Sequence, residues 1–333
     1  MIYHCLLTTV CCLLTTASDL NPPEVQSLIK SGLEYAYIEQ FDSAQIYFDE
    51  TIESYPNNPA GYFFKAALVQ LKMMDNCQFT GENQYLTLIK QAIKSAQAIL
   101  DKEDNLWAEF YLGSSHTYRA VYEGLKHNYF ETFKYGVKGG RILQGIIKKD
   151  STFYDAYLGA GSFEYFWARA ARYLPVLKLG GGNADEAIRK LHVAAEKSLY
   201  SNRTAQNSLV FIYGEEKNYA IAHSLIDSLL TQYPESKTFL WSKADLEFKE
   251  EKYFAAIRTY NELLSGYNAE KNKNYSNIAQ CKLAIGKCHY KLGEHNKARE
   301  ALKDVVRLKP HVDEYPLIKG YCHEAYGLLS RIF

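Results

Sequence analysis

The chain has 333 residues, with 38 Lys and Arg against 38 Asp and Glu, so its formal net charge is zero. Hydrophobic residues make up 47%, which excludes a disordered chain and is enough for a large core. A balanced charge without a basic block argues against sequence-independent nucleic-acid binding, because neutralising phosphates takes a clustered cationic face. With only 8 Pro and 20 Gly, helices are favoured; the compositional outliers are 28 Tyr and 16 Phe.

The first 18 residues, MIYHCLLTTVCCLLTTAS, contain no Asp, Glu, Lys or Arg. Their apolar run, Cys5–Leu14, is shorter than the ~20 residues of a transmembrane helix. It suits a secretory signal peptide with Thr15-Thr16-Ala17 as the cleavage site, although no basic residue precedes it. The sequence therefore predicts a signal peptide over residues 1–18 and an exported protein, periplasmic or secreted; a cytoplasmic protein with a hydrophobic leader is the alternative. No later segment is long and apolar enough to span a bilayer.

Small residues then recur at a spacing of twelve, within segments whose apolar residues follow a helical period. A small residue in the middle of a first helix lets the facing second helix approach closely, and a proline ends the second helix. The recurring sets are Gly32, Ala44 and Pro56; Val210, Ala222 and Pro234; Ala244 and Ala256; and Gly286, Ala298 and Pro310.

This spacing resembles the tetratricopeptide repeat (TPR), a helix–turn–helix unit of 34 residues. The resemblance implies an all-α fold, a TPR-like α-solenoid in which the repeats form a right-handed superhelix. We expect a single domain over residues 19–333, with about seven helix pairs over 24–312 and a capping helix over 313–333. In such an array each repeat touches only its neighbours.

The central repeats are expanded, since Gly113 and Gly159 are 46 residues apart. This part is similar to a group of bacterial exported TPR proteins of poorly defined role, and more distantly to eukaryotic TPR proteins implicated in inclusion-body clearance. The phrases that carry this resemblance are Asp155–Gly159, Leu174-Pro175 before a glycine triplet, and Asn274-Tyr275 before Cys281.

No motif indicates a cofactor, a metal or catalysis. The turn Gly180–Asn183 is followed by acidic residues, whereas a phosphate loop needs Lys and Ser or Thr there. Cys281 and Cys288 lie seven apart on one predicted helix, about 10.5 Å along its axis, and cannot share a zinc ion. The sequence predicts a non-enzymatic protein without metal or cofactor.

The inner face of the first helices is the candidate binding groove, because aromatic and polar side chains there suit a peptide. A chaperone-type carboxylate clamp is disfavoured, since Ile29 and Leu33 occupy the places of its Lys and Asn. The predicted function is a scaffold that binds a peptide or helix of a partner protein; the alternatives are a self-assembling structural repeat or an enzyme on a helical-repeat scaffold. The predicted groove residues are Phe63, Phe110, Tyr118, Phe163, Glu164, Asn207, Phe211, Trp241, Asp245, Phe248 and Lys287.

Overall fold

A computed structural model describes residues 19–76, 78–172 and 182–332, and these residues form helices with no strand among them. The predicted all-α fold is confirmed. The predicted signal peptide over residues 1–18, and Gly180 and Gly181 of the glycine turn, lie outside the described residues.

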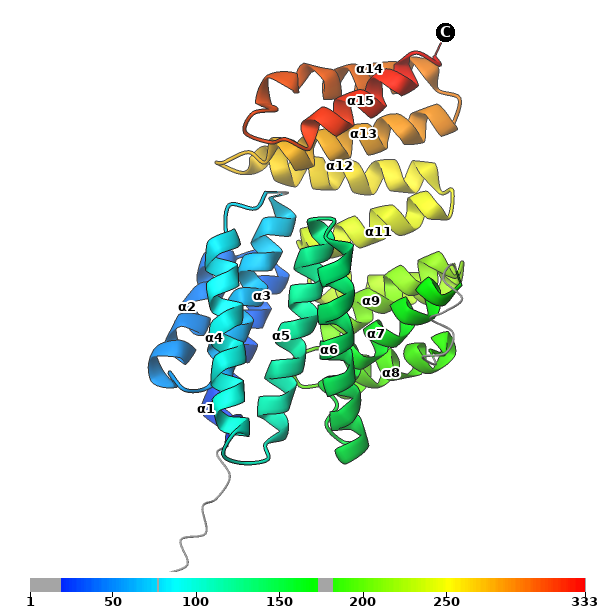
Figure 1. Cartoon of the computed structure of the whole chain (residues 1–333). Coiled ribbons are helices and arrows are strands. Elements are labelled where there is room, and N and C mark those ends of the chain that lie inside the picture. The colour runs from blue at the N-terminus through cyan, green and yellow to red at the C-terminus, as the bar shows by residue number, and fades with distance from the viewer. Residues whose placement is uncertain (1–18, 77, 173–181, 333) are drawn as a thin grey trace, which may run out of the picture.

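Inner and outer helices alternate along the chain and pack as antiparallel pairs (Figure 1). The pairs are α1 (Pro23–Tyr37) with α2 (Phe41–Ser54), α3 (Pro59–Asp75) with α4 (Glu82–Leu100), α5 (Leu106–Leu125) with α6 (Tyr129–Lys149), α7 (Ala156–Ala171) with α8 (Ala184–Lys197), α9 (Asn202–Glu215) with α10 (Tyr219–Gln232), α11 (Lys237–Lys249) with α12 (Tyr253–Ala269), and α13 (Tyr275–Lys291) with α14 (His295–Arg307). A 3₁₀ turn (Lys309–His311) then leads to α15 (Ile318–Leu329), which packs on α13 and α14.

Local sequence explains where the helices begin. The side-chain oxygens of Asn58, Asn105 and Asn274 each accept a hydrogen bond from a backbone N–H in the first turn of α3, α5 and α13. These bonds satisfy donors that a helix leaves without partners inside it. Several tight turns between an inner helix and its outer partner contain one residue with positive φ: Glu39, His127, Lys217, Glu251 and Gly293.

The spacing of small residues positions the first and seventh pairs as predicted. A Cβ atom on Gly286 would lie 2.8 Å from Cδ2 of Leu302 on the partner helix α14, and one on Gly32 would enter the Phe48 ring on α2. The close approach is therefore confirmed at both glycines. In the fourth pair Gly161, not Gly159, faces the outer helix: its Cβ would lie 3.0 Å from Cγ of Leu191.

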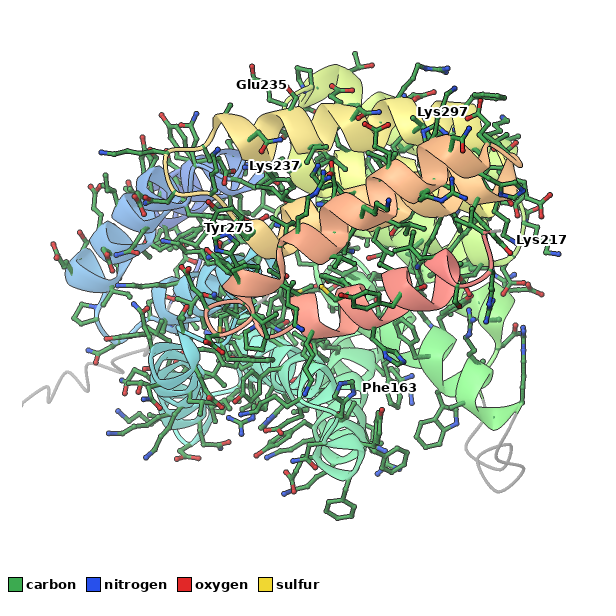
Figure 2. The ribbon with its side chains drawn as sticks, turned by 90° about the horizontal axis from the view of Figure 1, so that it is seen from above. Phe163, Lys217, Glu235, Lys237, Tyr275 and Lys297 are labelled. Atoms are coloured by element: carbon green, nitrogen blue, oxygen red, sulfur yellow. The ribbon has the colours of Figure 1, made fainter. Side chains whose placement is uncertain are left out.

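The superhelix closes on itself, because the turn after α1 reaches the start of α11. Glu39 accepts hydrogen bonds from the backbone N–H groups of Lys237 and Thr238, at 3.0 and 2.9 Å, and from the Thr238 hydroxyl at 2.7 Å. Seen from above, Lys237 lies where α11 meets the N-terminal helices (Figure 2). Nearby, Tyr233 donates its hydroxyl to Glu34.

A second contact between distant repeats is made by Tyr200, in the connection before α9. Its ring lies 5.2 Å from that of Phe64 on α3 and 5.8 Å from that of Trp107 on α5, and its hydroxyl donates to the side chain of Asn21. Tyr200 is 4% exposed and belongs to the core of the N-terminal repeats.

A third contact joins the end of α3 to the C-terminal helices, which lie across the upper end of α3–α6 in Figure 1. The carbonyl oxygen of Asp75 accepts hydrogen bonds from the side-chain amides of Asn274 and Asn277, at 2.9 and 2.6 Å. The Asp75 carboxylate accepts from the Tyr267 hydroxyl at 3.2 Å. The expectation that repeats touch only their neighbours is therefore wrong, because the first two repeats contact the fifth, sixth and seventh.

Candidate binding surface on the inner helices

The N-terminal half of the predicted groove is filled by the chain itself. Phe63 and Phe110 are 3% and 5% exposed, and Tyr118 packs edge-on against Phe63 with ring centroids 5.1 Å apart. They lie with Tyr200 in, or packed against, one apolar core, because closure of the superhelix brings the connection before α9 onto α3 and α5. The prediction that Phe63, Phe110 and Tyr118 line an open groove is wrong for this reason.

Two further predicted groove residues, both on α7, contact outer helices instead. The ring of Phe163, which is labelled in Figure 2, packs on Gly140 of α6, where a Cβ atom would overlap the ring. Glu164 accepts hydrogen bonds from Gln144 on α6 and Lys190 on α8, each at 2.6 Å. Their assignment to the inner face is wrong, because the register of α7 is shifted by two residues, from Gly159 to Gly161.

Trp241 packs within its own helix pair. Its Nε1–H donates to the Tyr267 hydroxyl at 2.9 Å, and its ring lies 5.8 Å from that of Tyr260. Both partners come from α12 and belong to the same core cluster, against which Trp241 and Phe248 are packed. The prediction of Trp241 as a groove anchor is therefore wrong; Phe248 likewise packs on Tyr253 of α12.

Phe211 and Asp245, on the adjacent inner helices α9 and α11, remain accessible. Phe211 is 48% exposed, and the ammonium group of Lys249 lies 4.6 Å from its ring centre. Asp245 is exposed and accepts a hydrogen bond from the Tyr260 hydroxyl at 2.8 Å. Desolvation nevertheless raises the pKa of Asp245, although the hydrogen bond from Tyr260 and the charges of Lys249 and Lys287 lower it.

Ion pairs connect the inner helices around these two residues. Glu215 on α9 pairs with Arg169 on α7 and Lys249 on α11, both at 2.6 Å. Lys287 on α13 pairs with Glu324 on α15, also at 2.6 Å. These pairs hold most of the charged groups of this face in place. Among the ion pairs of the described residues, none involves Asp245.

Asn207, one turn before Phe211 on α9, contributes a buried polar atom. Its Oδ1 is enclosed, and no hydrogen-bond partner for it is present among the described residues. A buried acceptor without a partner carries a desolvation cost. We define the inner face of the C-terminal repeats as Asn207, Phe211, Asp245, Lys249 and Lys287.

Neither a metal centre nor a membrane span is found in the described part of the chain. No three His, Cys, Asp or Glu side chains among residues 19–76, 78–172 and 182–332 come together to hold a metal ion. Within the same ranges, no helix combines the length and apolar character needed to cross a membrane.

The sequence reasoning missed the residues that close the superhelix, chiefly Glu39, Tyr200 and Tyr233. The 34-residue pattern specifies contacts within and between adjacent repeats, whereas these residues meet partners up to 199 positions away. The tyrosine excess was a signal of additional packing, but it does not indicate which rings pair.

The fold and the exposed inner face define an α-solenoid, an architecture that generally provides concave surfaces for binding other proteins. The sequence profile of the tetratricopeptide repeat family matches residues 237–310, which span α11–α14. These residues are tetratricopeptide repeats, as the spacing predicted. No curated protein sequence matches the chain.

Solved structures align with the chain over most of its length. A chain of the APC/C hetero-tetramer Cut9–Hcn1 aligns with a TM-score of 0.56 and 17% identity, over 94% of this chain and 57% of that one. The present chain thus spans just over half the length of that protein. A tetratricopeptide repeat protein from Parabacteroides merdae aligns at 15% identity and a TM-score of 0.43, over 91% of this chain and 99% of that one. Yeast Tom70 aligns at 10% identity and a TM-score of 0.37, over 92% and 82%.

Proposed function

We propose that the chain is a non-enzymatic scaffold that binds an extended peptide or a helix of a partner protein on the inner face of the C-terminal repeats. The observation that carries the proposal is the pair of Phe211 and Asp245. They expose an aromatic ring and a carboxylate on neighbouring inner helices, while the N-terminal inner face is filled.

The chemistry of this face suggests what it would bind. An aromatic ring beside an ordered cation offers an apolar contact surface, and partly exposed aromatic side chains are the usual anchors of interfaces. The Asp245 carboxylate, desolvated and outside the ion pairs of the face, favours a basic or N–H-bearing group of the ligand. A segment with an apolar side chain next to a Lys or Arg satisfies both.

The test compares Phe211→Ala with Phe254→Ala, an exposed phenylalanine on the outer helix α12. A partner is first captured with the wild-type chain, its binding segment is made as a peptide, and affinities are measured by calorimetry. Phe211→Ala should weaken binding by ~2 kcal/mol, roughly thirtyfold, as expected for a central anchor. Phe254→Ala should leave the affinity unchanged.

Asp245→Asn provides an independent check on the charge. It should weaken binding of a peptide that carries the basic residue and not of the same peptide with that residue replaced by Gln. If the peptide binds Phe211→Ala and Asp245→Asn as tightly as the wild type, the ligand does not occupy this face and the proposal is wrong.

A further inference from the structure

Charge is distributed unevenly over the outer helices, although the whole chain is neutral. Helix α2 carries four acidic residues and no basic one, whereas α6 carries five basic residues and one acidic one. The sequence contains no long basic block, because the bases of α6 are spread over 16 positions and only the last two are adjacent. The basic residues of α6 are Lys134, Lys138, Arg141, Lys148 and Lys149.

Four of these bases form one stripe. Lys134, Lys138, Arg141 and Lys148 follow one another at spacings of four, three and seven, which places them on a single face of the helix. All four are exposed, and the apolar residues of α6 that are buried, such as Leu143 and Ile146, lie on the opposite side.

Ion pairs leave most of the positive charge of the stripe without a neutralising partner among the described residues. Lys134 pairs with Glu131 at 3.0 Å, so its charge is partly offset. Among the ion pairs of the described residues, none involves Lys138, Arg141 or Lys148.

Exposed aromatic side chains lie at the N-terminal end of α6. Phe130 and Tyr129 are 75% and 72% exposed, the highest values among the large apolar side chains of the described residues. Phe130 shares the stripe, since it precedes Lys134 by four positions. Beside them Phe133, 50% exposed, stacks on Trp167 of α7 with ring centroids 5.5 Å apart. From Phe130 to Lys148 the stripe is about 27 Å long.

We propose that the outer face of α6 docks onto an anionic lipid membrane, with Lys138, Arg141 and Lys148 against the headgroups and Tyr129 and Phe130 inserted at the interface. Basic residues attract anionic lipids, and aromatic rings prefer the headgroup region. A protruding pair of rings at one end of a cationic helix provides the two signals that stable peripheral binding requires.

Other anionic partners fit this face less well. A purely acidic peptide would pair with the cations but offers no apolar layer for Tyr129 and Phe130. A nucleic acid would engage the cations, but Tyr129 and Phe130 lie together at one end of the stripe, whereas single-strand binding uses rings along the track of the cations. The site is on a different helix from the inner face, so this proposal is independent of the proposed function.

The experiment is co-sedimentation of the full chain with vesicles of phosphatidylcholine alone and of phosphatidylcholine mixed with phosphatidylglycerol. Residues 1–18 are present in every variant, so any binding they contribute is common to all. The wild type should bind the mixed vesicles preferentially, and added salt should weaken the binding. Lys138→Gln/Arg141→Gln/Lys148→Gln should bind about a hundredfold more weakly, from ~1 kcal/mol for each cation.

The matched control removes three exposed lysines of the C-terminal helices, Lys291→Gln/Lys303→Gln/Lys319→Gln, with the same change in net charge. It should bind like the wild type. Tyr129→Ser/Phe130→Ser should bind at least tenfold more weakly and depend more steeply on salt. Circular dichroism confirms that each variant is folded, since all the replaced side chains are exposed.

Three results would overturn the proposal. In the first, the wild type shows no preference for the anionic vesicles. In the second, the two triple variants bind the anionic vesicles equally tightly. In the third, poly(U) binds the wild type as tightly as the vesicles do and binds the Tyr129→Ser/Phe130→Ser variant equally well. That last result would identify the face as a site for a soluble polyanion.

Discussion

Replacing Glu39 by alanine tests whether closure of the superhelix stabilises the protein. Glu39 lies in the turn between α1 and α2, with φ of 53°, and accepts its hydrogen bonds from the first residues of α11, nearly 200 positions away. The carboxylate therefore caps α11 in the way that a side chain at the helix start normally does. Alanine removes the cap and changes nothing in the interior of either helix.

The expected cost follows from what the carboxylate satisfies. It accepts from two backbone N–H groups and one hydroxyl, at 3.0, 2.9 and 2.7 Å, and sits at the positive end of the α11 dipole. Loss of a capping side chain costs ~0.5–2 kcal/mol, and hydrogen bonds to a charged group lie at the upper end of such values. We expect Glu39→Ala to cost about 2 kcal/mol, and Glu39→Gln less, because one acceptor oxygen remains.

Amide hydrogen exchange gives the readout, since it reports the opening of each segment separately. A cost of about 2 kcal/mol corresponds to roughly thirtyfold faster exchange at Lys237 and Thr238. If closure couples the two turns, α1 and α2 exchange faster as well, while α14 and α15 do not. Glu235→Ala is the matched control: this exposed carboxylate adjoins the same helix start and makes no hydrogen bond to the other residues that the structure describes.

The reasoning fails if Glu39→Ala and Glu235→Ala give the same exchange pattern. It also fails if only the first turn of α11 exchanges faster while α1 and α2 stay as protected as in the wild type. In that case the array behaves as a sum of neighbour contacts, and the bonds between distant repeats do not contribute to stability.

Two more predictions concern the packing and the closure. Gly286→Leu should lower the free energy of unfolding by ~1–3 kcal/mol, measured in urea, because a Cβ atom there would already lie 2.8 Å from the buried Leu302 side chain. Leucine is the better helix former, so helix propensity alone predicts the opposite sign. A stabilised variant would contradict the packing. Burial raises the pKa of Asp75 to about 6. The nearby Glu39 and Glu270 carboxylates also raise this pKa, whereas the Lys237 ammonium group lowers it. The folded chain therefore binds this proton more tightly than the unfolded chain, and the stability gained below about pH 4 is lost as the pH rises through 6. Asp75→Asn keeps an acceptor for Tyr267 and should remove up to ~3 kcal/mol of this pH dependence, measured as Tm across the range; an unchanged profile would show that another group titrates.

The sequence could predict the helix pairs because the contacts within a pair are local and repeated. The pairs Gly32–Phe48 and Gly286–Leu302 each join positions 16 residues apart, and the same steric requirement recurs in successive repeats. The prediction failed for α7, where two glycines lie two residues apart. Either Gly159 or Gly161 suits a close approach, and only the packing of Leu143 and Leu191 distinguishes them.

The candidate site could be predicted only in part, for a different reason. The register identified inner-face positions, and Phe211 and Asp245 are accessible there. It could not indicate that Phe63 and Phe110 are covered, because the residue that covers them, Tyr200, belongs to another repeat and to a connection outside the repeat pattern. The curvature that brings Tyr200 onto α3 and α5 accumulates over several repeats.

Closure of the superhelix also bears on where a ligand can bind. In an open array, every inner helix contributes to the groove, and a ligand can shift along it. Here Tyr200 and the bonds of Glu39 and Asp75 fix the N-terminal repeats against the C-terminal ones. Binding to the N-terminal inner face would require breaking these contacts and exposing buried aromatic rings, whereas Phe211 is available without any rearrangement. A ligand that avoids this cost binds the C-terminal inner face, and the closed array supplies that face already ordered.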